Sequence, residues 1–373
     1  MDYSKKLKFH YRPKKGWIND PNGLVYYKGY YHIFYQHTPD YEYPVDPMCW
    51  GHAITKDFLE WEELPIALKS ENDYENWGCW SGTAIVKDEV LYIIYSSITM
   101  PEGKTDDFLK SNIQTVSVAY STDGINFEKY ENNPVIPSYP KDGSRNFRDP
   151  AIAYIDGKYY CVMASGHAES KKARLLLYES ENIFDWEYKG VLAEWDDALY
   201  AECPSFMQNG EKFILAASVC SCKNPIIHYF SLMSGSFENL KFDAEISNET
   251  DKGPDQYAGQ IFKDNTGRCI LISWIPGWSY INYYDKDIGC MSCPKEISVE
   301  NGKIKAFPVR ELRHLLKNSD PSVKITENGF VIERTGREPV IYEGKTDDIK
   351  ILRDEFVVEV FVNGGEEVYT ALL

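Results

Sequence analysis

Long apolar runs and an excess of positive charge are what this sequence lacks. Its longest apolar runs, such as Leu91–Tyr95, fall far short of the roughly 20 residues that a membrane helix needs, and its first residues show no apolar signal segment. Acidic residues outnumber basic ones by 57 to 40, which gives a net charge of −17. Such a balance disfavours nucleic acid and anionic membranes as partners. We therefore expect a soluble, unexported protein of the cytoplasm.

The cysteines give no sign of disulfide pairs. Nine cysteines, an odd number in a chain of 373 residues, argue against a disulfide framework. The pairs Cys220 with Cys222 and Cys290 with Cys293 could together form a zinc site, but no histidine is interleaved with them and both segments are typical of strands with buried thiols. We expect neither a metal nor another cofactor.

Aromatic residues, in contrast, are abundant, at 14% of the chain, and most of them are tyrosine. Tyrosine and tryptophan combine a large stacking surface with a polar tip, which suits either sugar binding or the core of a β-rich protein. The composition alone does not choose between the two.

A β-hairpin recurs five times along the chain. Each copy has an apolar run, a short turn with Gly, Asp or Asn, and a second apolar run, which is a strong local signal for a hairpin. The copies span residues 24–35, 84–95, 151–164, 205–217 and 261–274. Their spacing of about 60 residues indicates an internal repeat.

A second, weaker pattern follows the hairpins. It begins with Ser or Thr and leads to an aromatic residue and Glu, at 55–62, 121–128, 180–187 and, most weakly, 234–238; the last unit has a hairpin at 295–307 instead. Two hairpins per unit make four strands, and five such units predict an all-β fold, a five-bladed β-propeller. A β-sandwich is the structural alternative, but it does not account for the repeat.

The repeat ends before the chain does. We expect residues 1–316 to form the propeller, as the catalytic domain, and residues 317–373 to form a small C-terminal β module, after a linker at 318–321. Four short strands in this tail are too few to enclose much core alone, so the module should pack on the propeller as a truncated β-sandwich.

Polar residues stand at the start of the first hairpin strand in each repeat. These segments are 19–23, 80–82, 148–150, 202–204 and 257–260, and they include Asp20, Asp149 and Glu202. Taken singly, such residues are ordinary turn chemistry. Their repeated placement at strands that line a common channel suggests that they converge, and three adjacent carboxylates are costly unless they have a function. Two carboxylates flanking a bond, with a third group beside them, are the apparatus of glycoside hydrolysis.

The same segments resemble those of glycoside hydrolase family 32, the group of invertases, levanases and inulinases. The matching stretches occur in the family's order from residue 9 to residue 373: 16–23, 34–36, 50–54, 61–68, 80–82, 147–150, 202–204, 308–312 and 359–363. Any one of these motifs is weak, but the ordered set is specific. The C-terminal module is shorter than the sandwich that relatives usually carry.

The resemblance implies roles for single residues. Asp20 would be the nucleophile, Glu202 the general acid/base and Asp149 the stabiliser of the transition state. A retaining mechanism would place the carboxyls of Asp20 and Glu202 about 5–5.5 Å apart. The remaining sugar contacts implied by motif position are Asn19, Gln36, Trp50, Trp80, Ser81, Arg148, Tyr257 and Trp274.

Some of these residues have a second interpretation. Trp50 and Trp80 could instead be core tryptophans. Cys203, beside Glu202, could either pack or tune the environment of the glutamate. Arg145 could contact a phosphate or lie on the solvated surface.

The implied activity is a retaining glycoside hydrolase that releases terminal β-D-fructofuranosyl units through a covalent fructosyl-aspartate. Its substrate would be a small sugar: sucrose, sucrose 6-phosphate or a short fructo-oligosaccharide. An exo-levanase or inulinase, a fructosyltransferase of the same family, and a non-catalytic sugar-binding propeller are the alternatives. The sequence leaves open whether the chain forms a homo-oligomer.

Overall fold

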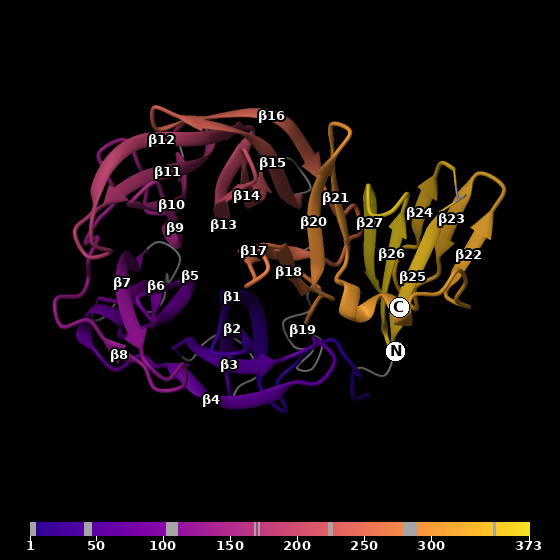
Figure 1. Cartoon of the computed structure of the whole chain (residues 1–373), viewed down its shortest axis with the longest axis horizontal. Helices are drawn as coiled ribbons and strands as arrows, with labels where there is room; N and C mark the ends of the chain where they lie inside the picture. The colour runs from indigo at the N-terminus through magenta and orange to yellow at the C-terminus, as the bar shows by residue number, and fades with distance from the viewer. Residues whose placement is uncertain are drawn as a thin grey trace.

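β-Strands form nearly all of the regular structure of this chain. The computed structural model describes residues 5–40, 47–101, 111–167, 169–170, 172–222, 227–278, 289–345 and 348–373 (Figure 1). Helical structure in these residues includes the short 3₁₀ turns η1 (Asp73–Glu75) and η3 (Arg310–Leu315). The predicted all-β class is confirmed. In the described ranges, no helix has the length and apolar character to cross a membrane.

Five antiparallel sheets of four or five strands follow one another along the chain. The first contains β1 (Trp17–Tyr27), β2 (Tyr30–Thr38), β3 (Cys49–Thr55) and β4 (Glu62–Leu68); the second β5 (Gly78–Lys87), β6 (Val90–Thr99), β7 (Ile113–Ser121) and β8 (Glu128–Lys129); the third β9 (Phe147–Ile155), β10 (Lys158–His167), β11 (Lys172–Ser180) and β12 (Glu187–Asp196); the fourth β13 (Ala198–Asn209), β14 (Lys212–Ser221), β15 (His228–Glu238) and β16 (Lys241–Glu249); the fifth β17 (Tyr257–Lys263), β18 (Cys269–Ile275), β19 (Cys290–Met291), β20 (Lys295–Glu300) and β21 (Lys303–Pro308).

All five predicted hairpins are present, as the first two strands of the five sheets. Local turn chemistry explains why. Lys28-Gly29 and Asp156-Gly157 both have positive φ at their two central residues, as the tight turns that match the twist of a hairpin require.

The second repeated pattern is a turn that a side chain closes. Asp57 accepts hydrogen bonds from the N–H groups of Leu59 and Glu60 between β3 and β4, and Asp123 and Asn182 act in the same way in the next two sheets. The fourth predicted copy, 234–238, is wrong, because these residues lie inside β15, paired with β16. The turn comes after them, at Asn239-Leu240, where φ is positive.

The five sheets are set around a common centre, with their first strands innermost (Figure 1). Strand β1 contacts β5, β5 contacts β9, β9 contacts β13, β13 contacts β17, and β17 contacts β1. Apolar clusters fill the spaces between neighbouring sheets. The polar starts of the five inner strands are thereby brought to one region of the molecule.

The C-terminal residues form two three-stranded sheets. Their strands are β22 (Val323–Thr326), β23 (Gly329–Ile332), β24 (Val340–Glu343), β25 (Ile349–Asp354), β26 (Val357–Val362) and β27 (Glu367–Leu372). The prediction of four strands is therefore wrong, and so is the expectation of little core. Phe330, Ile332 and Val360 belong to an apolar cluster between the two sheets, because alternate residues of β26 face β23 while Phe361 faces the opposite way, into the cluster of the fifth sheet.

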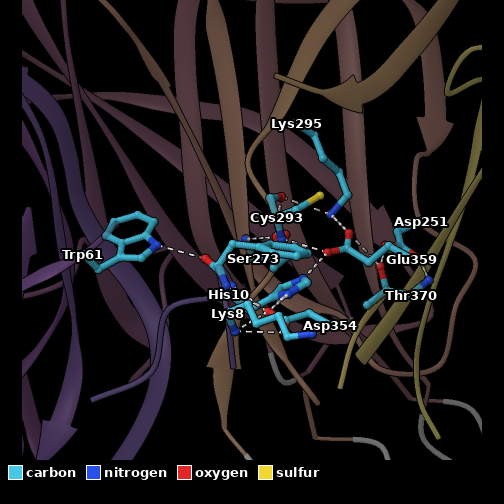
Figure 2. A network of polar contacts seen from close by, with 12 residues as sticks. Lys8, His10, Trp61, Asp251, Ser273, Cys293, Lys295, Asp354, Glu359 and Thr370 are labelled. Atoms are coloured by element: carbon cyan, nitrogen blue, oxygen red, sulfur yellow. Dashed lines mark hydrogen bonds and ion pairs between the residues drawn. The ribbon is translucent and has the colours of Figure 1, made fainter. Parts of the chain in front are cut away.

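A buried polar network joins this tail to the rest of the chain (Figure 2). Glu359, within the apolar strand β26, lies 2.5 Å from Lys295 Nζ of β20 and 2.8 Å from His10 Nε2. His10 Nδ1 lies 3.1 Å from Asp354, whose carboxylate also accepts the backbone N–H of Lys8. The network thus ties the segment before β1, the fifth sheet and the tail together.

Candidate active site

Each of the five innermost strands has a register shift where its predicted polar residues lie. The shifts fall at 18–21 in β1, 80–82 in β5, 148–151 in β9, 202–205 in β13 and 257–260 in β17. An extra residue on one strand bends it and re-aims its side chains, which is common beside active sites. In this chain the five shifts turn polar side chains of neighbouring sheets toward one another.

The backbone at three of these shifts is in the left-handed region. Asp149, Cys203 and Ala258 have φ of 58°, 47° and 52°, a conformation that side chains with a Cβ adopt only at a cost. Hydrogen bonds hold the first two in place. The N–H of Asp149 donates to Ser96 Oγ at 2.7 Å, and the N–H of Cys203 donates to Asp149 Oδ2 at 2.9 Å.

Asp20 lies in β1 as a half-buried carboxylate with three side-chain donors. Asn19 Nδ2 donates to Oδ1 at 3.0 Å, while Ser81 Oγ and Cys203 Sγ donate to Oδ2 at 2.8 and 3.4 Å. Burial and the charge of Glu202 raise the pKa of Asp20, although the three donors act against them. All three donors are neutral, and among the described residues no cation forms an ion pair with this carboxylate.

Asp149 is more deeply buried, at 3% exposure. Burial raises the pKa of Asp149 to about 7; Arg148 opposes the change, and the charges of Glu202 and Asp20 add to it. The Cys203 thiol lies 3.7 Å from Asp149 Oδ2, so one sulfur contacts both aspartates. Burial, followed by these acidic neighbours, raises the pKa of Cys203 well above its usual value, and the thiol stays neutral.

Glu202 has a different set of partners. Arg148 Nη2 donates to Oε1 at 2.9 Å, and the hydroxyl of Tyr257 donates to Oε2 at 2.5 Å. The guanidinium lies over the ring of Tyr200, 5.0 Å from its centroid. Burial acts to lower the pKa of Arg148, but the charges of Glu202 and Asp149 outweigh burial and raise that pKa. The third carboxylate is therefore held by a permanent cation and a phenol.

The structure brings most of the predicted contact residues to these carboxylates. Asn19 and Ser81 touch Asp20, and Arg148 and Tyr257 touch Glu202. Trp80 is half-buried and packs against the apolar cluster that contains Cys203 and Tyr257. Gln36 lies one layer back, where its side-chain amide donates to the carbonyl of Cys79 at 3.2 Å.

Trp50 and Trp274 are not placed as predicted. Both side chains are fully buried, so neither ring presents a surface to a ligand. Trp50 packs beside Phe34 and donates to the carbonyl of Trp80 at 3.0 Å, whereas Trp274 packs against Trp17. The alternative interpretation of Trp50 as a core tryptophan is the one that the structure supports, because β3 is covered on both faces.

Sequence reasoning missed two residues of this cluster, Ser96, which holds the N–H of Asp149, and Tyr200, which lies beneath Arg148. A usable signal was present for Tyr200, which precedes Glu202 by two residues and so shares its side of the strand. Cys203 was singled out as a neighbour of Glu202, but its contacts are with Asp20 and Asp149.

No metal-binding arrangement is found in the part of the chain that the structure describes, where no group of three or more His, Cys, Asp or Glu side chains could hold an ion. The two cysteine pairs considered as a zinc site lie in different sheets, and all nine cysteines are free thiols. Arg145 is exposed and donates to the carbonyl of Asn112 at 3.1 Å.

Comparison with known proteins identifies the class. Residues 10–308 match the family model described as "Glycosyl hydrolases family 32 N-terminal domain". The chain therefore belongs to glycoside hydrolase family 32, as the motifs predicted.

Among curated relatives, the sucrose-6-phosphate hydrolase of Zymomonas mobilis is 33% identical over 84% of this chain, and the raffinose invertase of Escherichia coli is 32% identical over 86%. The chain spans 63% of the first protein's length and 68% of the second's. Among solved structures, the family 32 β-fructofuranosidase of Bombyx mori has a TM-score of 0.83 and 27% identity, covering 99% of this chain and 89% of its own.

Proposed function

We propose that the chain is a retaining β-fructofuranosidase built on a five-bladed β-propeller, with residues 1–316 as the catalytic domain and 317–373 as a small C-terminal β module. The five sheets and the contacts between their first strands support the propeller. The separate apolar cluster of the last two sheets supports the module. Relatives named as hydrolases and invertases support the activity.

One observation carries the assignment of roles: the two carboxylates needed for retention have unlike partners. Asp20 has only neutral donors, and Glu202 has Arg148 and Tyr257. Two acids can take different roles at one pH when their surroundings differ in this way. The chemistry needs no metal and no cofactor, because carboxylates supply the nucleophile, acid and base.

In the first step Asp20 attacks C2 of the β-fructofuranosyl unit while protonated Glu202 gives its proton to the departing oxygen. A covalent fructosyl-aspartate forms with inversion at C2. Arg148 and Tyr257 keep the carboxyl of Glu202 in place during this transfer. Asp149 accepts hydrogen bonds from fructose hydroxyls as the ring gains oxocarbenium character. Its negative charge then lies beside the positive charge that develops on the ring in the transition state.

In the second step Glu202, now ionised, takes a proton from water. The water attacks C2, Asp20 leaves, and fructose is released with its original β configuration. Asn19, Ser81 and Cys203 stabilise the returning carboxylate of Asp20.

The substrate we propose is a small fructoside such as sucrose, sucrose 6-phosphate or a short fructo-oligosaccharide. The names of the relatives support the first two, and a variant of the Bombyx mori enzyme, 26% identical to this chain, has been solved with sucrose bound. Nine free thiols suit a reducing compartment, which supports a location in the cytoplasm.

The test quantifies fructose and glucose released from sucrose, sucrose 6-phosphate, kestose and levan. Release of fructose from the small substrates, and little from levan, is expected. Reaction in aqueous methanol should give methyl β-D-fructofuranoside, since retention passes the fructosyl group to an acceptor on the same face. The α anomer as the product would refute the covalent mechanism, and binding without cleavage of any of the four sugars would refute the enzyme.

A further inference from the structure

The segment between β16 and β17 lies along the last strand of the C-terminal module. Asp251 forms a parallel bridge with Val368 of β27, and Lys252 N–H donates to the carbonyl of Val368 at 2.8 Å. Asp251 also accepts the hydroxyl of Thr370, at the edge of the network in Figure 2. A Cβ on Gly253 would lie 2.2 Å from backbone atoms of Thr370. The segment therefore has no room to slide against the module.

Asp255 fixes the end of this segment. Its fully buried carboxylate accepts from Arg334 Nη2 at 2.5 Å and from the N–H of Leu372 at 2.7 Å. Arg334 in turn donates through Nε to the carbonyl of Leu372 at 2.8 Å. A buried ion pair with backbone partners on both sides is rigid, because moving either group leaves a buried charge without compensation.

Two residues beyond Asp255 lies Tyr257, whose hydroxyl donates to Glu202. The intervening Gln256 donates to Ser273 Oγ at 2.8 Å, so the backbone between them is held as well. Tyr257 is itself buried, at 1% exposure, and its hydroxyl lies 2.5 Å from Glu202 Oε2. The backbone that carries this hydroxyl therefore begins two residues after the point at which the module holds Asp255.

From this geometry we propose that Asp255 and Arg334 are positioning residues for Glu202, acting through Tyr257, and that the C-terminal module is thereby part of the catalytic apparatus. The proposal rests on the proposed function, in which Glu202 is the acid/base. A displacement of about 1 Å in a catalytic group can cost on the order of 10²-fold in rate. Arg148 still holds the other oxygen of Glu202, so the loss expected here is smaller.

The experiment is a double-mutant cycle on sucrose with Asp255→Asn and Tyr257→Phe. Asp255→Asn should lower kcat about tenfold, with a smaller change in KM. It should also move the basic limb of the pH–rate profile to higher pH. A displaced Tyr257 hydroxyl donates more weakly to Glu202, and losing a hydrogen bond to the ionised form favours the protonated carboxyl. In a Tyr257→Phe background the same substitution should change kcat less than about twofold, since coupled residues are not additive.

Glu359→Gln is the matched control. It also removes a buried carboxylate of the module, but Glu359 bonds to Lys295 and His10 rather than to the segment before Tyr257. It should lower the melting temperature and leave the pH–rate profile unchanged. If Asp255→Asn does not fold, Arg334→Lys replaces it in the cycle. This substitution retains the positive charge but loses the two guanidinium donors, Nε and Nη2, that bind Leu372 and Asp255.

Equal effects of Asp255→Asn in both backgrounds, or a profile that overlays the parent, would overturn the positioning role. So would the same kinetic change in Glu359→Gln, because the module would then act through stability alone. A parent enzyme that releases no fructose would instead refute the proposed function, and the two failures are therefore distinguishable.

Discussion

Two of the places where the molecule buries acidic side chains surround them differently. At the junction with the C-terminal module, Glu359 and Asp354 face Lys295 and His10. At the inner strands, Asp20 and Asp149 face the charge of Glu202 and share one neutral thiol, and Arg148 reaches Asp149 only at 3.9 Å. Both sets lie in the same all-β framework, so the difference comes from the partners and not from the fold.

At the junction the partners overcome the cost of burial. Burial acts to raise the pKa of Glu359, but Lys295 and then His10 lower it to about 2. Burial likewise acts to raise the pKa of Asp354, and hydrogen bonding to His10 lowers it to about 2. These carboxylates are therefore ionised at neutral pH.

At the inner strands the cost of burial is not offset. The pKa of Asp149 rises to about 7 and that of Asp20 also rises. Electrostatic strain of this kind is typical of sites where groups must change protonation or form bonds. The comparison shows that close cations offset burial at the junction, whereas Asp20 and Asp149 keep raised pKa values even though Arg148 acts against burial at Asp149.

The largest effect expected is on catalysis. Asp20→Asn removes the proposed nucleophile and should reduce fructose release from sucrose by at least about 10³-fold, because an amide cannot form the covalent intermediate. The melting temperature should equal or exceed that of the parent, since a raised pKa marks a charge that the folded state disfavours.

Initial rates and thermal unfolding on the same preparations check both points. Activity above about one hundredth of the parent would contradict the role of Asp20.

The second expectation contrasts the two sets in stability. Glu359→Gln leaves Lys295 buried with its charge uncompensated and should cost about 3–5 kcal/mol of unfolding free energy. Asp149→Asn removes a disfavoured charge but keeps an oxygen for the N–H of Cys203, and should raise stability by about 1–2 kcal/mol while activity falls.

Urea unfolding of both variants at pH 7.5 gives the two free energies, on the order of a few kcal/mol apart. Changes of the same sign would mean that the two sets of acids do not differ as described.

A third expectation concerns pH. The pKa of His10 is raised, because hydrogen bonds and charges from Asp354 and Glu359 outweigh burial; its contribution is present below the unfolded value of 6.5 and is lost as pH rises through the folded value. The lowered pKa values of Asp354 and Glu359 give stability that is lost as pH falls from about 4 to about 2.

The pKa of Asp149, raised to about 7, adds a decline in stability between about pH 4 and 7, because the folded state disfavours its charge. Unfolding free energy measured across pH should therefore be highest near about pH 4 and fall on both sides. In His10→Gln the decline above pH 6.5 should be reduced, and an unchanged alkaline slope would refute the contribution of His10.

The smallest effect expected is at Cys203. Its thiol donates to Asp20 and so acts to lower the pKa of that carboxyl. Cys203→Ala should move the acid limb of the kcat/KM profile upward by about half a pH unit, the size of a weak hydrogen bond. Cys203→Ser should restore most of the shift, and profiles that overlay the parent on both limbs would leave Cys203 a packing residue only.

Much of the fold could be predicted because its signals are local. Turn pairs such as Lys28-Gly29 specify hairpins from their own backbone preferences, and the repeat then places the inner strands around one centre. Strands β22 and β25 were missed because charged residues such as Lys324 and Lys350 interrupt their apolar pattern.

The parts of the site that could not be predicted depend on contacts between distant segments. The burial of Trp50 depends on neighbours from another sheet. The bridging position of Cys203 depends on its positive φ at the register shift in β13. Glu359 stands alone in an apolar strand, which is a visible signal, but its partners Lys295 and His10 are far away in the chain.

The bond between His10 and Asp354 also has a consequence for synthesis. The two residues are 344 positions apart, so this contact forms only after Asp354 has left the ribosome. Until then the first sheet lacks part of the apolar cluster that it shares with the fifth sheet and the tail, and its apolar face is exposed in the way that makes partly made β-proteins prone to aggregate. Cellular yield should therefore respond to translation rate and to chaperones more strongly than the stability of the finished molecule suggests.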